Sequence, residues 1–307
     1  NHQTTAAYAA YADASFDLSD RLSISAGIRF TEEEKDFARI QEFFDATTPI
    51  VPVLGQGARV TDIDVSETFS NTSPKFSISY DLTDDVTTYA SYSRGFKSGG
   101  FDGRSNSGLE AQPFDAETLT AWEAGLKGDF LENTISLSAA VFLNQYEDLQ
   151  VSSFTQQNGA FAAIFTNAAE ASIAGFEVEG SWQASSALRF DYALGYLDAD
   201  YDTFIGQNGQ DVSDQLTPAN APDWTGRLAA EYITQLSSSV DLILSGAASY
   251  RGDVYPTVSS SEVLRQSSYT LYDASARLEF ENGKYALTLS GRNLSDEEYR
   301  TQGFDLS

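Results

Sequence analysis

The feature of this sequence that most constrains its fold is a series of short polar turns, spaced about 45 to 65 residues apart along the 307-residue chain. Each turn separates two stretches in which apolar and polar side chains alternate. The other ends of these stretches are joined by much longer segments rich in Gly, Asn and Asp. Short turns at one rim and long loops at the other are typical of an outer-membrane β-barrel. The short turns cover residues 17–20, 81–85, 131–133, 184–187, 236–239 and 281–284.

The alternation is clear in residues 21–30, where Leu22, Ile24 and Ile28 share one face of a strand and Arg21 and Arg29 share the other. Six hairpins of this kind predict about twelve strands of about 10 to 16 residues, longer than the strands of most globular proteins. Such lengths suit a tilted strand that crosses a membrane. We therefore predict an all-β fold, an antiparallel transmembrane β-barrel.

The two-residue alternation also predicts which side chains face lipid and which face the lumen. In residues 86–97, however, Tyr89 and Tyr92 fall on opposite faces, and the pattern does not say which of them faces lipid. The side chains expected to face lipid are Leu22, Ile24, Ile28, Leu137, Val141, Leu188, Phe190, Leu194, Leu242, Leu287 and Leu289. Those expected to face the lumen are Arg21, Arg29, Glu177, Glu179, Arg189, Asp191, Arg277 and Arg292. The expected external loops are residues 41–66, 98–113, 203–221 and 253–267.

Composition excludes several classes of protein. Apolar residues make up 41% of the chain, but no uninterrupted run approaches the roughly 20 residues of a membrane-spanning helix. The absence of Cys and a single histidine, His2, exclude a disulfide framework and His or Cys zinc sites, and we expect no enzyme, cofactor or metal centre. A net charge of −27 makes nucleic acid a poor partner. Aromatic content of 13% suits interfacial girdles, although a tyrosine-rich soluble β-sandwich would have a similar composition.

An ordered series of motifs, each weak alone, runs along the chain. It comprises residues 89–101 (YASYSRGFKSGGF), 114–118 (FDAET), 122–127 (WEAGLK), 140–150 (AVFLNQYEDLQ), 166–170 (TNAAE), 175–179 (GFEVE) and 291–299 (GRNLSDEEY). This series resembles the C-terminal barrel portion of TonB-dependent outer-membrane receptors. The resemblance implies a 22-stranded barrel, preceded by a plug domain and a TonB box.

Neither a plug nor a TonB box is recognisable in the sequence, and the last strand of the family would follow residue 307. No Met and no signal peptide are present. We therefore expect residues 1–307 to be a partial barrel domain, a fragment or processed chain without the plug, the early strands and the last strand.

The resemblance implies a receptor of the outer membrane that binds a scarce solute and imports it when TonB acts on the plug. The implied partners are TonB, membrane lipid and a small ligand, with an iron–siderophore complex as the most frequent cargo of the family. Cobalamin and oligosaccharides are alternative cargoes. A passive porin or a soluble β-sandwich binding module would share the same periodicity.

Anionic ferric siderophores need cationic or aromatic groups near the extracellular mouth. The candidate ligand-binding residues close to long loops are Arg94, Lys97, Arg104, Arg251, Tyr92, Phe96, Phe101 and Tyr255. The alternative is that these residues shape the rim and balance nearby acids. We expect a structural role, in lumenal charge ladders, for Glu117, Glu123, Lys127, Glu177 and Glu179. Gly95, Gly99 and Gly100 are expected to allow a turn or a close backbone approach.

Overall fold

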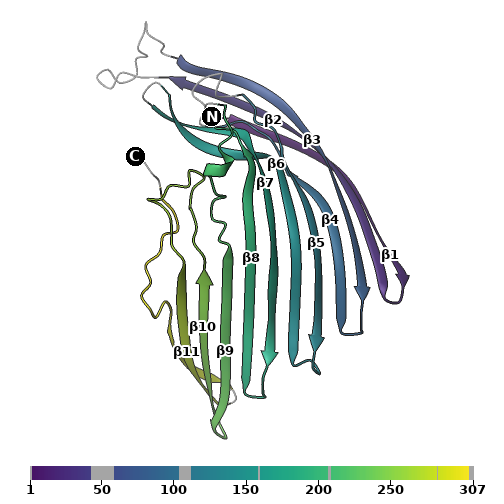
Figure 1. The fold of residues 1–307 in the computed structure, drawn as a ribbon, viewed down its shortest axis with the longest axis vertical. Helices are drawn as coiled ribbons and strands as arrows, with labels where there is room; N and C mark the ends of the chain where they lie inside the picture. The colour runs from purple at the N-terminus through teal and green to yellow at the C-terminus, as the bar shows by residue number, and fades with distance from the viewer. Residues whose placement is uncertain are drawn as a thin grey trace.

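The computed structural model describes residues 2–42, 59–103, 112–157, 160–206, 209–281 and 283–303. Within them, twelve strands form one antiparallel sheet, in which each strand pairs with its neighbours in chain order (Figure 1). The strands are β1 (His2–Ser19), β2 (Leu22–Glu42), β3 (Arg59–Asp81), β4 (Val86–Lys97), β5 (Glu117–Phe130), β6 (Ile135–Gln157), β7 (Ala160–Gln183), β8 (Leu188–Phe204), β9 (Trp224–Ser237), β10 (Val240–Arg251), β11 (Tyr269–Phe280) and β12 (Tyr285–Gly291).

The sheet is a curved wall with short turns at one rim and long connections at the other (Figure 1). All six predicted turns join adjacent antiparallel strands, from β1–β2 to β11–β12. The prediction of an all-β antiparallel fold with about twelve strands is therefore confirmed. The described strands do not close the wall, because β1 and β12 each pair with one neighbour. The one helical segment of the described ranges is the 3-10 turn η1 (Ser213–Gln215), and no helix there is long and apolar enough to span a membrane.

The strands near the long-loop rim extend further than the predicted 16 residues. β6 has 23 residues and β7 has 24, and β3 begins at Arg59. The predicted external loop 41–66 is therefore wrong over 41–42, which end β2, and over 59–66, which pair with β2. Residues 43–58 lie outside the described part of the chain. The reason is physical. Past the apolar band the outer face becomes polar as well, as at Glu32 and Glu34, so the alternation of apolar and polar side chains ends while the hydrogen-bond ladder continues.

Alternation along each strand gives the wall an apolar outer face and a polar inner face. The predicted lipid-facing side chains lie together on the outer face, and several are strongly exposed, with Val141 at 58% and Leu289 at 77%. Such exposure is unusual in a soluble protein. On the inner face, the predicted lumenal pair Arg189 and Asp191 forms an ion pair of 2.7 Å.

Two aromatic belts border the apolar band of the outer face. The belt on the long-loop side consists of Tyr92, Trp122, Phe176, Tyr196, Trp224 and Tyr272, with ring centroids 4.5 Å apart for Tyr92–Trp122 and 4.8 Å for Tyr196–Trp224. The belt on the short-turn side consists of Phe130, Trp182, Phe190, Tyr232, Phe280 and Tyr285. Trp122 and Phe130 are eight residues apart, about 26 Å along a strand. This matches the apolar band of about 25 Å in outer-membrane barrels, once a modest tilt is included.

Candidate functional site on the lumenal wall

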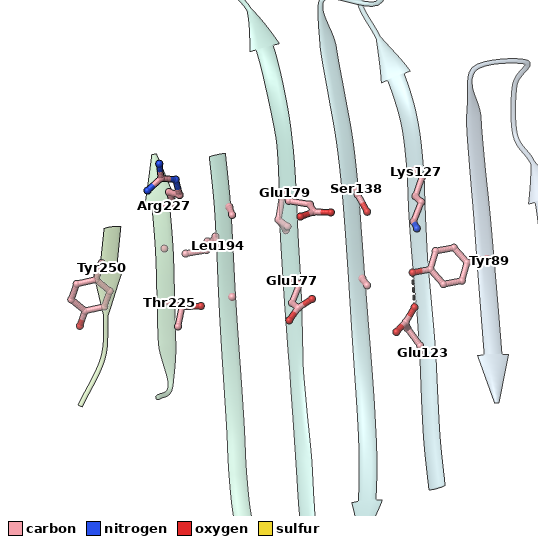
Figure 2. A pocket seen from close by; sticks show the side chains of 15 residues that line it. Tyr89, Glu123, Lys127, Ser138, Glu177, Glu179, Leu194, Thr225, Arg227 and Tyr250 are labelled. Atoms are coloured by element: carbon pink, nitrogen blue, oxygen red, sulfur yellow. Dashed lines mark hydrogen bonds between the residues drawn. The ribbon is translucent and has the colours of Figure 1, made fainter. Parts of the chain in front are cut away.

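A groove of about 470 Å³ crosses the inner face of strands β4 to β9. Figure 2 shows its charged and polar side chains spread along neighbouring strands. The lining side chains on the lumenal face are Tyr89, Glu123, Lys127, Ser138, Glu177, Glu179, Thr225 and Arg227. These groups can donate and accept hydrogen bonds across a wide surface. They do not form a cluster suited to a metal ion within the described residues.

Tyr89 settles which face of β4 points to the lumen. Its hydroxyl donates a 2.6 Å hydrogen bond to Glu123, and the Lys127 ammonium lies 5.6 Å from its ring centroid (Figure 2). Both partners belong to β5, in which Glu123 and Lys127 share the inner face. Tyr89 is therefore lumenal, and Tyr92, which packs on Trp122, faces outward. Glu123 and Lys127, expected to belong to a lumenal charge ladder, thus both interact with Tyr89.

Basic side chains of β2 hold the loop that follows β4 against the inner wall. The Lys35 ammonium donates a 2.6 Å hydrogen bond to the carbonyl of Gly99, and Arg39 donates one of 2.9 Å to Gly103. Gly99 lies so close to its neighbours that a Cβ there would be 2.3 Å from the carbonyl oxygen of Phe114. The expected close backbone approach is thus present at Gly99. It fixes the start of the loop in place.

Two amide side chains brace the base of the same loop. Gln150 donates hydrogen bonds of 3.0 Å to the carbonyls of Ser98 and Asp115. Asn167 donates to the carbonyls of Asp115 and Asp148, at 2.9 and 2.7 Å, and accepts from the amide of Asp115 at 2.7 Å. These amides replace backbone partners where the strand ladder is interrupted. The sequence motifs contain both residues, but nothing in the motifs reveals this bracing role.

A second group of loops is joined around an apolar cluster. Val151, Ala169 and Phe204 are buried there, with Val212 and Val258 packed against them. This cluster joins the tops of β6, β7 and β8 to the β8–β9 and β10–β11 connections. Hydrogen bonds add to it, because the amide of Thr217 donates to the hydroxyl of Ser260 and the amide of Asn220 donates to the carbonyl of Tyr255, both at 2.8 Å. Both connections are therefore held together over the long-loop rim.

The candidate ligand-binding residues do not converge on one site. Tyr92, Arg94 and Phe96 alternate onto the outer face of β4. Phe101 is buried at 6% exposure, and its ring stacks on Phe37 at 5.9 Å, so it supports the loop. Arg104 lies outside the described residues.

Lys97, Arg251 and Tyr255 are the candidates placed on the lumenal side or in a loop. Lys97 faces inward, is 62% exposed and lies 3.6 Å from Glu117. Arg251 faces inward at the top of β10, and its Nε is buried without a hydrogen-bond partner. Tyr255 donates a 2.5 Å hydrogen bond to Glu262 in the β10–β11 connection.

The β10–β11 connection should loosen in acid. The Asp253 carboxylate accepts a 2.7 Å hydrogen bond from the amide of Ser268 and pairs with Arg265, and these contacts lower the pKa of Asp253. Because the folded pKa lies below the ordinary value of about 3.9, this contribution is complete above that value and is lost as the pH falls through the folded pKa. We expect hydrogen exchange at the Ser268 amide, corrected for its intrinsic rate, to stay constant from pH 8 to 5 and to accelerate below about pH 4. Asp253→Asn should remove this change, and its persistence in the variant would contradict the assignment.

The comparisons with known proteins agree with this architecture. A family model described as the TonB-dependent receptor-like β-barrel matches residues 1–294. The chain belongs to this family. The resemblance and the outer-membrane location predicted from the sequence are therefore confirmed, and a passive porin is not supported.

Two curated relatives of this TonB-dependent receptor barrel are receptors. The pesticin receptor of Yersinia enterocolitica is 23% identical over 313 residues, which cover 99% of this chain and 41% of the relative. The probable TonB-dependent siderophore receptor PiuA of Acinetobacter baumannii is 26% identical and covers 74% of this chain and 30% of its own length. The chain thus spans at most about two fifths of these relatives.

A solved structure shows the same fold. The ferric yersiniabactin uptake receptor FyuA from Yersinia pestis superimposes with a TM-score of 0.80 at 22% identity, over 99% of this chain and 43% of that receptor. At this identity the likeness establishes the fold of the barrel wall.

Proposed function

We propose that this chain forms part of the wall of an outer-membrane receptor that imports a scarce solute through the action of TonB, and that its cargo is an iron–siderophore complex. The names of the similar receptors support this class of cargo. The observation that carries the proposal is the distribution of charge. In a chain of net charge −27, the strand lysines and arginines whose side chains are described point to the lumen, apart from Arg94. An anionic ferric complex would meet these cations on its path.

The energy source can be tested in the intact receptor. In cells that have this receptor as their sole route for a ferric siderophore, uptake of the radiolabelled complex should stop when TonB is removed, while binding at the cell surface continues. A porin would give uptake without TonB. Uptake that persists at the wild-type rate would therefore overturn the proposal.

Lys97 and Arg251 are the lumenal cations best placed to meet the ligand at the mouth. Replacing both with Gln in the intact receptor should weaken binding of an anionic ferric complex about tenfold, by loss of charge-assisted hydrogen bonds, and should reduce its salt dependence. Arg277→Gln is the matched control, because Arg277 faces the lumen near the short-turn rim and is paired with Glu279 at 2.8 Å. Equal losses in the double variant and the control would reject a specific role for the mouth residues.

A further inference from the structure

Arg94 breaks the charge pattern of the wall. Tyr89 faces the lumen, so strand alternation places Tyr92 and Arg94 on the outer face and Lys97 on the inner face. Among the strand lysines and arginines whose side chains are described, Arg94 alone faces outward. The inward ones are Arg29, Lys35, Arg39, Lys75, Lys97, Lys127, Arg189, Arg227, Arg251 and Arg277.

The depth of Arg94 explains why an outward cation is tolerated there. β4 runs toward the long-loop rim, and Arg94 lies two residues beyond Tyr92 of the aromatic belt, about 7 Å further along the strand. An arginine on the lipid face costs about 2–4 kcal/mol at the midplane of a bilayer and about 0–1 kcal/mol near its interfaces. Arg94 therefore lies at the level of the lipid headgroups, on the external side.

An apolar groove lies on the same outer face and begins at Tyr92, two residues below Arg94 on β4. Its volume is about 470 Å³. Trp122, whose ring packs against that of Tyr92 at an interplanar angle of 48°, is 52% exposed, and the groove continues toward the centre of the apolar band. The outward side chains that line it are Phe76, Ile78, Tyr92, Trp122, Val141 and Leu143.

The guanidinium of Arg94 keeps donors for a further partner. Its Nη2 donates to Glu147 at 3.1 Å and to Thr118 at 3.4 Å, and its Nε is buried without a hydrogen-bond partner. The side chain is 40% exposed. A guanidinium has five N–H donors in a rigid fork that fits phosphate oxygens. Glu147 holds the fork against the wall on one side, and a second anion can approach the other.

We propose that Arg94 and the groove below it bind a phosphate-bearing, acylated lipid of the outer leaflet, with its phosphate on Arg94 and an acyl chain in the groove. Charge complementarity selects this occupant. A free phosphate has no apolar part that could fill the aromatic groove. An uncharged lipid would supply no anion for the outward guanidinium of Arg94. A phosphorylated lipid has both parts, in the order that the wall presents them.

The test uses the intact receptor, purified in detergent and titrated with bis-phosphorylated lipid A while native mass spectrometry counts the bound lipid. Arg94→Gln should weaken binding about tenfold, the value of one charge-assisted contact. Glu147→Gln should strengthen it, because a competing anion is removed while Arg94 keeps its charge. Trp122→Ala should weaken binding of lipid A and of its dephosphorylated form alike. Arg21→Gln is the matched control, since Arg21 is an exposed arginine paired with Asp84 at 3.4 Å on the opposite rim.

The proposal stands if Arg94→Gln and Glu147→Gln change the affinity in opposite directions while Arg21→Gln leaves it unchanged. It is overturned if Arg94→Gln binds lipid A as the wild type does, or if Arg21→Gln loses as much. It also fails if dephosphorylated lipid A binds equally well, or if inorganic phosphate alone displaces the lipid completely. A heat-modifiable shift in gel mobility shows that each variant has a folded barrel.

Discussion

Leu126→Arg is expected to lower the free energy of unfolding of the intact receptor in a bilayer by about 2–4 kcal/mol. Leu126 lies on the outer face of β5, midway between Trp122 and Phe130 of the two aromatic belts. An arginine at this depth has no water and no carboxylate partner, so its charge must be desolvated or must draw water into the lipid. The folded fraction in phospholipid vesicles, followed through a urea titration, measures the loss.

Thr120→Arg is the control for this prediction. Thr120 lies on the same strand and the same face, but beyond Trp122 on the long-loop side, beside Arg94 in the adjacent strand. At the level of the headgroups the same substitution should cost about 0–1 kcal/mol. Equal costs at positions 120 and 126 would mean that the aromatic belts do not mark the limits of the apolar band.

The turns and the alternation could be predicted from the sequence because lipid imposes both. Between the belts every second side chain must be apolar, as from Phe190 to Tyr196 in β8, and each short turn must reverse the chain within a few residues. Past the belts this constraint ends. The β2–β3 and β6–β7 hairpins continue there on the hydrogen-bond ladder and on local packing, such as that of Phe37 and Val151. Their additional length has no periodic signal and was missed for this reason.

The candidate site was harder to predict because it depends on contacts between distant strands. Both faces of β4 have an aromatic residue, so the alternation alone could not show which of Tyr89 and Tyr92 faces the lumen. Their partners on β5 show it, because Tyr89 bonds to the inward Glu123 and Tyr92 packs on the outward Trp122. Phe101 resembles an exposed loop aromatic in the sequence, and its burial follows from Phe37 on β2. The bracing roles of side-chain amides likewise depend on carbonyls contributed by other strands.

Glycines opposite aromatic residues recur along the wall, and those on its inner face help to position the lumenal groove. Tyr89 pairs with Gly125 and Phe142 with Gly175 on the inner face, and Tyr192 pairs with Gly180 on the outer face. In each pair the ring covers the glycine and takes the space that a side chain would occupy. The motif glycines at 125 and 175 are thus explained by packing.

Gly125→Ala is therefore expected to lower the free energy of unfolding by about 1–3 kcal/mol, the usual cost of overpacking. A Cβ at this position would lie 2.7 Å from the ring of Tyr89 and 2.7 Å from the backbone oxygen of Ala139. The Tyr89 ring would have to move, and its hydrogen bond to Glu123 would lengthen. Urea unfolding in vesicles gives the stability, and tyrosine hydroxyl exchange reports the bond.

Gly226→Ala is the matched control, because Gly226 is also a strand glycine but a Cβ there meets Leu194 and Ala193 at 3.8 and 3.9 Å, ordinary contact distances. Without a clash, the substitution should be neutral or should stabilise the receptor by about 0.5–1 kcal/mol, since alanine loses less backbone freedom on folding than glycine does. The two variants are thus expected to change stability in opposite directions. A loss of similar size in both would show that backbone flexibility, and not the space filled by the Tyr89 ring, is the reason for glycine at position 125.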